Sequence, residues 1–97
     1  MEFTIKNVQR SAQDMMRAIG YTPAYFQKEG ELSMIRKLGG EYPRFHLYIV
    51  QQGHDMIFKL HLDQKKPSYE GATGHSGDYD GPAVENEAER IKSLLHA

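Results

Sequence analysis

The fold is decided by one stretch of the chain, residues 44–63, which reads RFHLYIVQQGHDMIFKLHLD. Apolar and polar side chains alternate on both sides of a glycine at position 53. A period of two is typical of a strand with one buried face, and a glycine between two such runs favours a tight turn. The stretch therefore predicts a β-hairpin with one apolar face and one polar face.

Two registers fit this hairpin. A turn at Gln52–Gly53 pairs Val50 with Asp55. A turn at Gly53–His54 places glycine at the first central position, as a type II′ turn requires. This second register matches apolar residues with each other and forms three polar pairs: Tyr48 with Lys59, His46 with His61, and Arg44 with Asp63. Cross-strand pairs contribute up to ~1 kcal/mol each, so we predict the second register.

Helical periodicity precedes and follows the hairpin. The first helix is expected from about Val8 to Ile19, with Ser11 in a capping pattern and Gly20 at its end. The second is expected from Pro82 to about Leu95, because proline suits the first helical position. Its apolar stripe consists of Val84, Ala88, Ile91 and Leu95. Its charges follow the helix dipole, with Glu85, Glu87 and Glu89 early and Arg90, Lys92 and His96 late.

Further extended segments complete the expected fold. Phe3–Ile5 is a short extended piece, Tyr25–Lys28 is predicted as a short strand, and Glu31–Leu38 as a longer one. Residues 64–81 contain four glycines and no periodicity, which predicts a long irregular loop. We expect a single α+β domain over residues 1–97. It combines an antiparallel meander of three to four strands with N-terminal and C-terminal helices packed on one sheet face.

Composition excludes several classes of protein. The 97 residues include no cysteine, which removes disulfides, thiolate catalysis, iron–sulfur clusters and cysteine-based zinc sites. Apolar residues form no uninterrupted stretch of the length that a signal peptide or a membrane span needs. We therefore expect a cytoplasmic protein without membrane contact.

The charge pattern argues against nucleic-acid binding. The formal net charge is -1, which is unlike a basic nucleic-acid binder. The order helix, three strands, helix is similar to that of the double-stranded RNA-binding domain. That family has a lysine-rich turn before its last helix, where this chain reads DGPAVENE at residues 80–87. Those carboxylates would repel phosphates, so nucleic acid is not an expected partner.

The polar face of the hairpin is the first candidate site. We use "polar face" for Arg44, His46, Tyr48, Lys59, His61 and Asp63. Arginine and histidine side chains donate hydrogen bonds to carboxylates and phosphates. We therefore expect a small non-enzymatic binding module that holds an anionic ligand or a protein partner, with residues 64–81 as a lid. The expected binding residues are Arg44, His46, Tyr48, Lys59, His61 and Lys65.

Metal binding is a second interpretation of the same face. His61 and Asp63 are two residues apart, His46 lies opposite His61 in the predicted register, and His75 lies in the following loop. Two imidazoles and a carboxylate can hold a divalent metal such as zinc and leave a position open for chemistry. The spacing corresponds to no named motif. A metal-dependent enzyme or metal-binding protein using His46, His61, Asp63 and His75 is therefore the alternative function.

Self-association and a family resemblance complete the sequence analysis. A chain of this size buries roughly two-thirds of its unfolded surface, so a homodimer that covers the polar face is a third expectation. The segment HLDQKKPSYEG at residues 61–71, followed by YDG at 79–81, resembles small proteins of unknown function encoded in bacterial genomes. That resemblance implies a bacterial protein and carries no activity or site residue.

Overall fold

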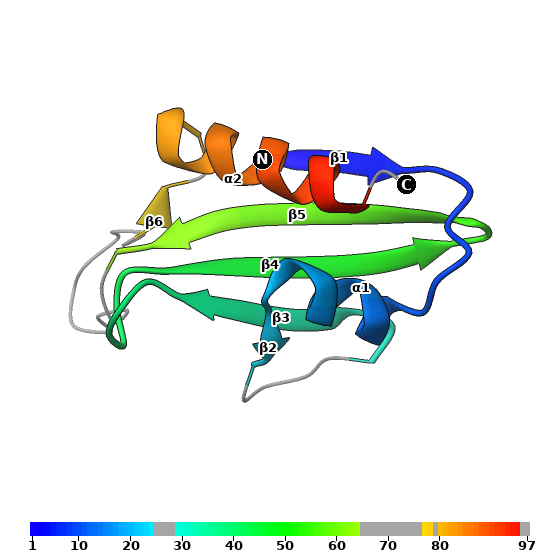
Figure 1. Cartoon of the computed structure of the whole chain (residues 1–97), viewed down its shortest axis with the longest axis horizontal. Coiled ribbons are helices and arrows are strands. Elements are labelled where there is room, and N and C mark those ends of the chain that lie inside the picture. Colours follow the sequence, from blue (N-terminus) through cyan, green and yellow to red (C-terminus); the bar gives the residue numbers. More distant parts are fainter. Residues whose placement is uncertain (25–28, 65–76, 79, 96–97) are drawn as a thin grey trace.

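The structure, a computed structural model, describes residues 1–24, 29–64, 77–78 and 80–95. Within these residues it is α+β, with helices α1 (Ala12–Ile19) and α2 (Pro82–Leu95) on one face of an antiparallel sheet (Figure 1). The strands are β1 (Glu2–Ile5), β2 (Thr22–Pro23), β3 (Leu32–Lys37), β4 (Arg44–Gln52), β5 (Asp55–Asp63) and β6 (Gly77–Asp78). Their order is β1-β5-β4-β3-β2, and β6 pairs with the end of β5. The predicted fold class is confirmed, but the sheet has more strands than the three to four expected.

The hairpin of β4 and β5 adopts the second of the two predicted registers. Gln52 pairs with Asp55 around the turn, and Arg44 pairs with Asp63 at the far end. Gly53 has φ 63°, the positive value that the first central position of a type II′ turn needs and that glycine adopts without steric cost. Every polar pair of the prediction is therefore present.

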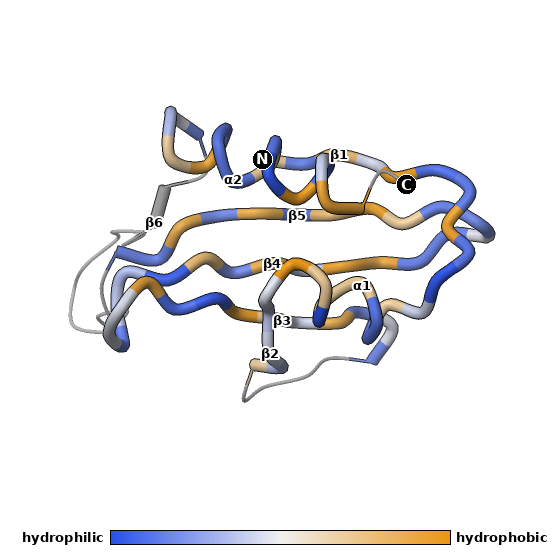
Figure 2. Tube along the Cα trace, viewed as in Figure 1, coloured by the Kyte–Doolittle hydropathy of each residue, from blue (hydrophilic) through white to orange (hydrophobic). Residues whose placement is uncertain are grey.

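The apolar face of the sheet forms the core with the two helices. Alternating residues of β4 and β5 are buried, and Figure 2 shows hydrophobic positions recurring along both strands and both helices. The helices contribute Met15, Met16, Ile19, Val84, Ala88, Ile91 and Leu95. Burying one Leu, Phe or Met side chain contributes roughly 1.5–3 kcal/mol. This packing fixes one sheet face against the helices and turns the polar face away from them.

The first helix is shorter than predicted. It begins at Ala12, where the Ser11 hydroxyl accepts a hydrogen bond from the Asp14 N–H at 3.1 Å. The expectation that the helix starts near Val8 is wrong. The Val8 N–H donates instead to the His54 carbonyl at 2.8 Å, so this segment passes beside the hairpin turn.

The extended segments outside the hairpin agree with the predictions in part. The extended piece at Phe3–Ile5 belongs to β1, an edge strand whose Phe3 pairs with Phe58 of β5. Residues 64–81 are not wholly irregular, because β6 lies among them. The strand expected at Tyr25–Lys28 falls outside the described residues, and β2 lies just before it. Pairing of β1 with β5 joins segments more than 50 residues apart, which local periodicity does not report.

Candidate metal site on the polar face

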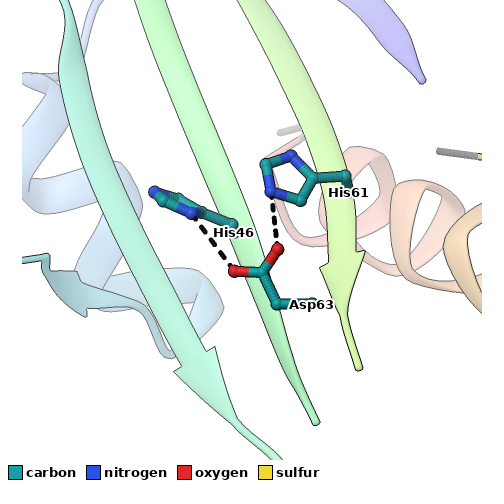
Figure 3. Close-up of side chains that lie close together, drawn as sticks. All are labelled: His46, His61 and Asp63. Carbon is teal, nitrogen blue, oxygen red and sulfur yellow. Dashed lines mark ion pairs between the residues drawn. The ribbon is translucent and has the colours of Figure 1, made fainter. Parts of the chain in front are cut away.

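Strand register brings three potential metal ligands together. His46 of β4 lies directly opposite His61 of β5, and Asp63 follows two residues after His61. Residues two apart on a strand project from the same face. All three side chains therefore project from the face opposite the helices, and Figure 3 shows them converging.

The Asp63 carboxylate is the centre of this group. Its Oδ1 lies 2.8 Å from His61 Nε2, and its Oδ2 lies 3.5 Å from His46 Nδ1. One potential ligand atom from each residue lies within 4.8 Å of the others. The side chains of His61, His46 and Asp63 are 13%, 15% and 19% exposed, so solvent reaches the cluster but does not surround it.

Aromatic stacking restricts the two imidazoles. The Tyr48 ring stacks on His46 with centroids 4.2 Å apart and an interplanar angle of 24°. His61 lies 5.0 Å from His46 and 5.7 Å from Tyr48, centroid to centroid. Offset ring contacts of this kind contribute about 0.5–1.5 kcal/mol beyond buried area. These contacts restrict the orientation of both imidazole rings.

Ser33 is a member of the site that the sequence analysis did not identify. Its side chain is buried on β3, and its Oγ lies 2.6 Å from His46 Nε2. This contact occupies one ring nitrogen and turns the other, Nδ1, toward Asp63. The available signal was that Ser33 falls on the outward side of a strand beside β4, where it pairs with Tyr48.

Asp63 is held in its ionised form. Burial on its own raises the pKa of a carboxyl group, but hydrogen bonds from His46 and His61, together with their charge, outweigh it. The pKa of Asp63 is therefore well below its ordinary value. A carboxylate that stays ionised is a ready ligand for a cation.

Arg44 lies at the edge of the cluster. Its Nε is 3.6 Å from Asp63 Oδ2, so the predicted pair exists as an ion pair, although the separation exceeds hydrogen-bond length. Its Nη1 is 3.7 Å from a Glu41 oxygen, and its guanidinium lies 4.7 Å from the centre of the Tyr42 ring. The buried Nε atom has no hydrogen-bond partner among the described residues.

Of the remaining predicted site residues, one lies on the polar face and two cannot be placed. Lys59 is exposed on the polar face, where it pairs with Tyr48 across the hairpin. Lys65 and His75 lie outside the described residues. The polar face is therefore assembled as the sequence predicted, with Ser33 added.

A second polar cluster lies on the helix side of the sheet. The Glu87 side chain of α2 is 3% exposed and accepts hydrogen bonds from Tyr21 Oη at 2.7 Å and from Arg90 Nε at 2.7 Å. Arg36 Nη1 of β3 lies 3.4 Å from it, and Arg90 Nη2 also donates to the Ile19 carbonyl at 2.6 Å. The sequence analysis assigned Glu87 to the helix dipole and to the acidic segment 80–87, and not to the core. Glu87 therefore links α2 to β3 and to Tyr21, and Arg90 extends the network to the end of α1.

Comparisons with known proteins yield no relative for this arrangement. The chain matches no protein-family model, no curated protein and no solved structure. Among the described residues, no helix has the length and apolar character needed to cross a bilayer. Function must therefore be argued from the polar face itself.

Proposed function

We propose that the chain binds a divalent transition-metal ion through His46, His61 and Asp63. The observation that carries the proposal is the convergence of two imidazole nitrogens on one ionised carboxylate, with the three ligand atoms within 4.8 Å of one another. Two imidazoles and a carboxylate suit zinc and ferrous iron and leave coordination positions for water or substrate. This takes the metal-binding alternative of the sequence analysis without His75.

Spacing and ring orientation both support a metal ion. Two ligands at about 2.0–2.1 Å from a tetrahedral zinc ion lie about 3.3 Å apart. His46 Nδ1 lies 3.5 Å from Asp63 Oδ2 and His61 Nε2 lies 2.8 Å from Asp63 Oδ1, so the two separations fall on either side of that ligand spacing. A cation bound at His46 Nδ1 would replace the proton that this nitrogen shares with Asp63, and the Ser33 Oγ would then accept a hydrogen bond from Nε2–H.

Metal titration of the chelator-treated protein tests this proposal. We expect one equivalent of Co²⁺ to bind with an absorption spectrum typical of nitrogen and oxygen ligands, and Zn²⁺ to displace it. His61→Ala should weaken binding at least about a hundredfold, since losing a ligand costs more than losing an outer-shell partner. His54→Ala is the matched control, because His54 is an exposed histidine at the hairpin turn. Equal affinity of the wild type and His61→Ala would contradict the proposal.

The second part of the proposal is an anionic ligand on the loaded metal. Arg44 and Lys59 lie on the same face as the three ligands, each two residues along its strand from a histidine. Together with a divalent ion they favour a carboxylate or phosphate at the open coordination position. This joins the anionic-ligand prediction to the metal site.

Inorganic phosphate is the probe for this second part. Phosphate should change the spectrum of the cobalt-loaded protein, and Lys59→Gln should weaken phosphate binding about threefold without changing cobalt affinity. Equal phosphate binding by the metal-free protein would favour anion binding by the side chains alone. No binding in either state would overturn the anionic-ligand proposal.

Self-association through the polar face stays a prediction. A second copy over this face would block the open coordination position, so it competes with the metal-and-anion proposal. Mass measurement in solution at high protein concentration distinguishes the two, because a monomer at all concentrations excludes the covered face.

A further inference from the structure

A groove lies at the end of the molecule opposite the metal ligands, where the chain passes from β1 to α1. Ile5, which lines the groove, pairs with Met56 near the start of β5, whereas His61 and Asp63 lie at the end of that strand. Its volume is about 730 Å³, within the range of small-molecule sites. The groove is therefore distinct from the polar face.

The floor of the groove is apolar. Ile5 and Val8 are half-buried, and Met15 and Leu95 are buried beneath them. The contributing elements are β1, the segment before α1, α1 itself and the last turn of α2. An aliphatic chain placed here would replace water against side chains that already belong to the core.

The rim of the groove is positively charged. Lys6, Arg10 and Lys92 line it, and none of its described lining residues is acidic. Lys92 is already engaged, 3.6 Å from Glu89 and 5.1 Å from the centre of the Phe3 ring. Lys6 and Arg10 are exposed and form no ion pair with any other described residue. These two cations are available to an anionic group.

We propose that this groove binds a monocarboxylate with a short aliphatic chain. The chain lies on Ile5 and Val8, and the carboxylate accepts hydrogen bonds from Lys6 and Arg10. An apolar floor beside uncompensated cations suits a ligand with one charged end and one apolar end. A phosphate ion lacks the apolar part, and an alcohol of the same length lacks the charge.

Sodium octanoate is the probe, titrated into the metal-free, isotope-labelled protein and followed by amide chemical shifts. We expect saturable shifts confined to the β1–α1 segment and the last turn of α2. The double variant Lys6→Gln/Arg10→Gln should bind about tenfold more weakly, because both charge-assisted hydrogen bonds are lost. The control, Arg17→Gln/Lys37→Gln, removes two exposed cations outside the groove and the polar face and should bind like the wild type.

Two further measurements use other ligands and do not depend on whether the variants fold. On the wild type, 1-octanol should bind at least about tenfold more weakly than octanoate, since only the charge differs. Vesicles containing an anionic phospholipid test a membrane surface as the ligand instead. Shifts outside the groove, equal binding of octanol and octanoate, or binding of vesicles without binding of octanoate would each overturn the proposal.

Discussion

Two carboxylates, one on either side of the same sheet, organise polar clusters of different character. Asp63 on the polar face accepts from imidazoles and is 19% exposed, whereas Glu87 on the helix side accepts from arginine and tyrosine side chains and is 3% exposed. Imidazoles carry lone pairs and can ligate a metal ion, but a guanidinium has donors only. The partners of each carboxylate therefore decide whether it can ligate a metal ion together with them or only cross-links the fold.

Removing the carboxylate of Glu87 should give the largest effect. Glu87→Ala leaves Arg36, Arg90 and Tyr21 without their shared acceptor, so we expect the free energy of unfolding to fall by about 3 kcal/mol. Urea denaturation measures this change. Glu89→Ala on the same helix is the control, because the Glu89 side chain is 76% exposed, and it should change stability by less than about 0.5 kcal/mol. Similar losses in the two variants would mean that the Glu87 cluster does not hold the helices to the sheet.

Ser33 provides the corresponding test on the polar face. Ser33→Ala removes the contact with His46 Nε2 and should weaken Co²⁺ binding about tenfold, or ~1.4 kcal/mol, through loss of ring orientation. Ser33→Thr keeps the hydroxyl and should restore most of the affinity. A thermal unfolding curve of the metal-free alanine variant separates a loss of orientation from a loss of fold. Unchanged cobalt affinity in Ser33→Ala would remove Ser33 from the site.

Tyr21 tests the contribution of the Glu87 cluster to stability at high pH. Burial, the hydrogen bond to Glu87 and the Glu87 charge raise the pKa of Tyr21 far above its ordinary value. A pKa raised by folding contributes stability that is complete below about pH 10 and is lost as the pH rises above it. Tyr21→Phe should cost about 1 kcal/mol at neutral pH and show a shallower loss of stability above pH 10. An equal loss of the free energy of unfolding above pH 10 in Tyr21→Phe and in the wild type would contradict this.

Asp63 provides the matching experiment at low pH, where we expect an effect no larger than that of Tyr21→Phe. Because the pKa of Asp63 is lowered by folding, its contribution is present above about pH 4 and is lost as the pH falls below that value. Asp63→Asn in metal-free protein should therefore be about 1 kcal/mol less stable than the wild type at neutral pH. That difference should shrink between pH 4 and pH 2 in urea denaturation. A constant difference over this range would mean that Asp63 is not stabilised as a carboxylate.

The cluster around Asp63 could be predicted from the sequence, whereas the cluster around Glu87 could not. The face shared by His46, His61 and Asp63 follows from period-two alternation and a single glycine turn, because register fixes side-chain direction. The Glu87 cluster depends on tertiary contact, although a signal was present. Glu87 lies three residues after Val84 and four before Ile91, and Arg36 alternates with Met34, so two opposite charges occupy core-facing positions.

In the fold, too, elements set by local sequence were predicted, whereas contacts between segments far apart in the chain were not. The second helix, Pro82–Leu95, is confirmed because its stripe and first-position proline are local features. The start of the first helix was misplaced because Val8 is apolar, yet it packs as part of the segment beside the hairpin turn. The place of β1 next to β5 and the contact of Ser33 with His46 arise only when distant segments meet.

The outermost strand, β2, has a consequence for behaviour at high concentration. The Ala24 N–H donates to the Ser33 carbonyl, so alternation along an antiparallel pair directs the neighbouring Pro23 nitrogen away from β3. That nitrogen carries no hydrogen, and an incoming chain finds no donor there to extend the sheet. Proline at this position therefore disfavours pairing of another strand with this edge of the sheet.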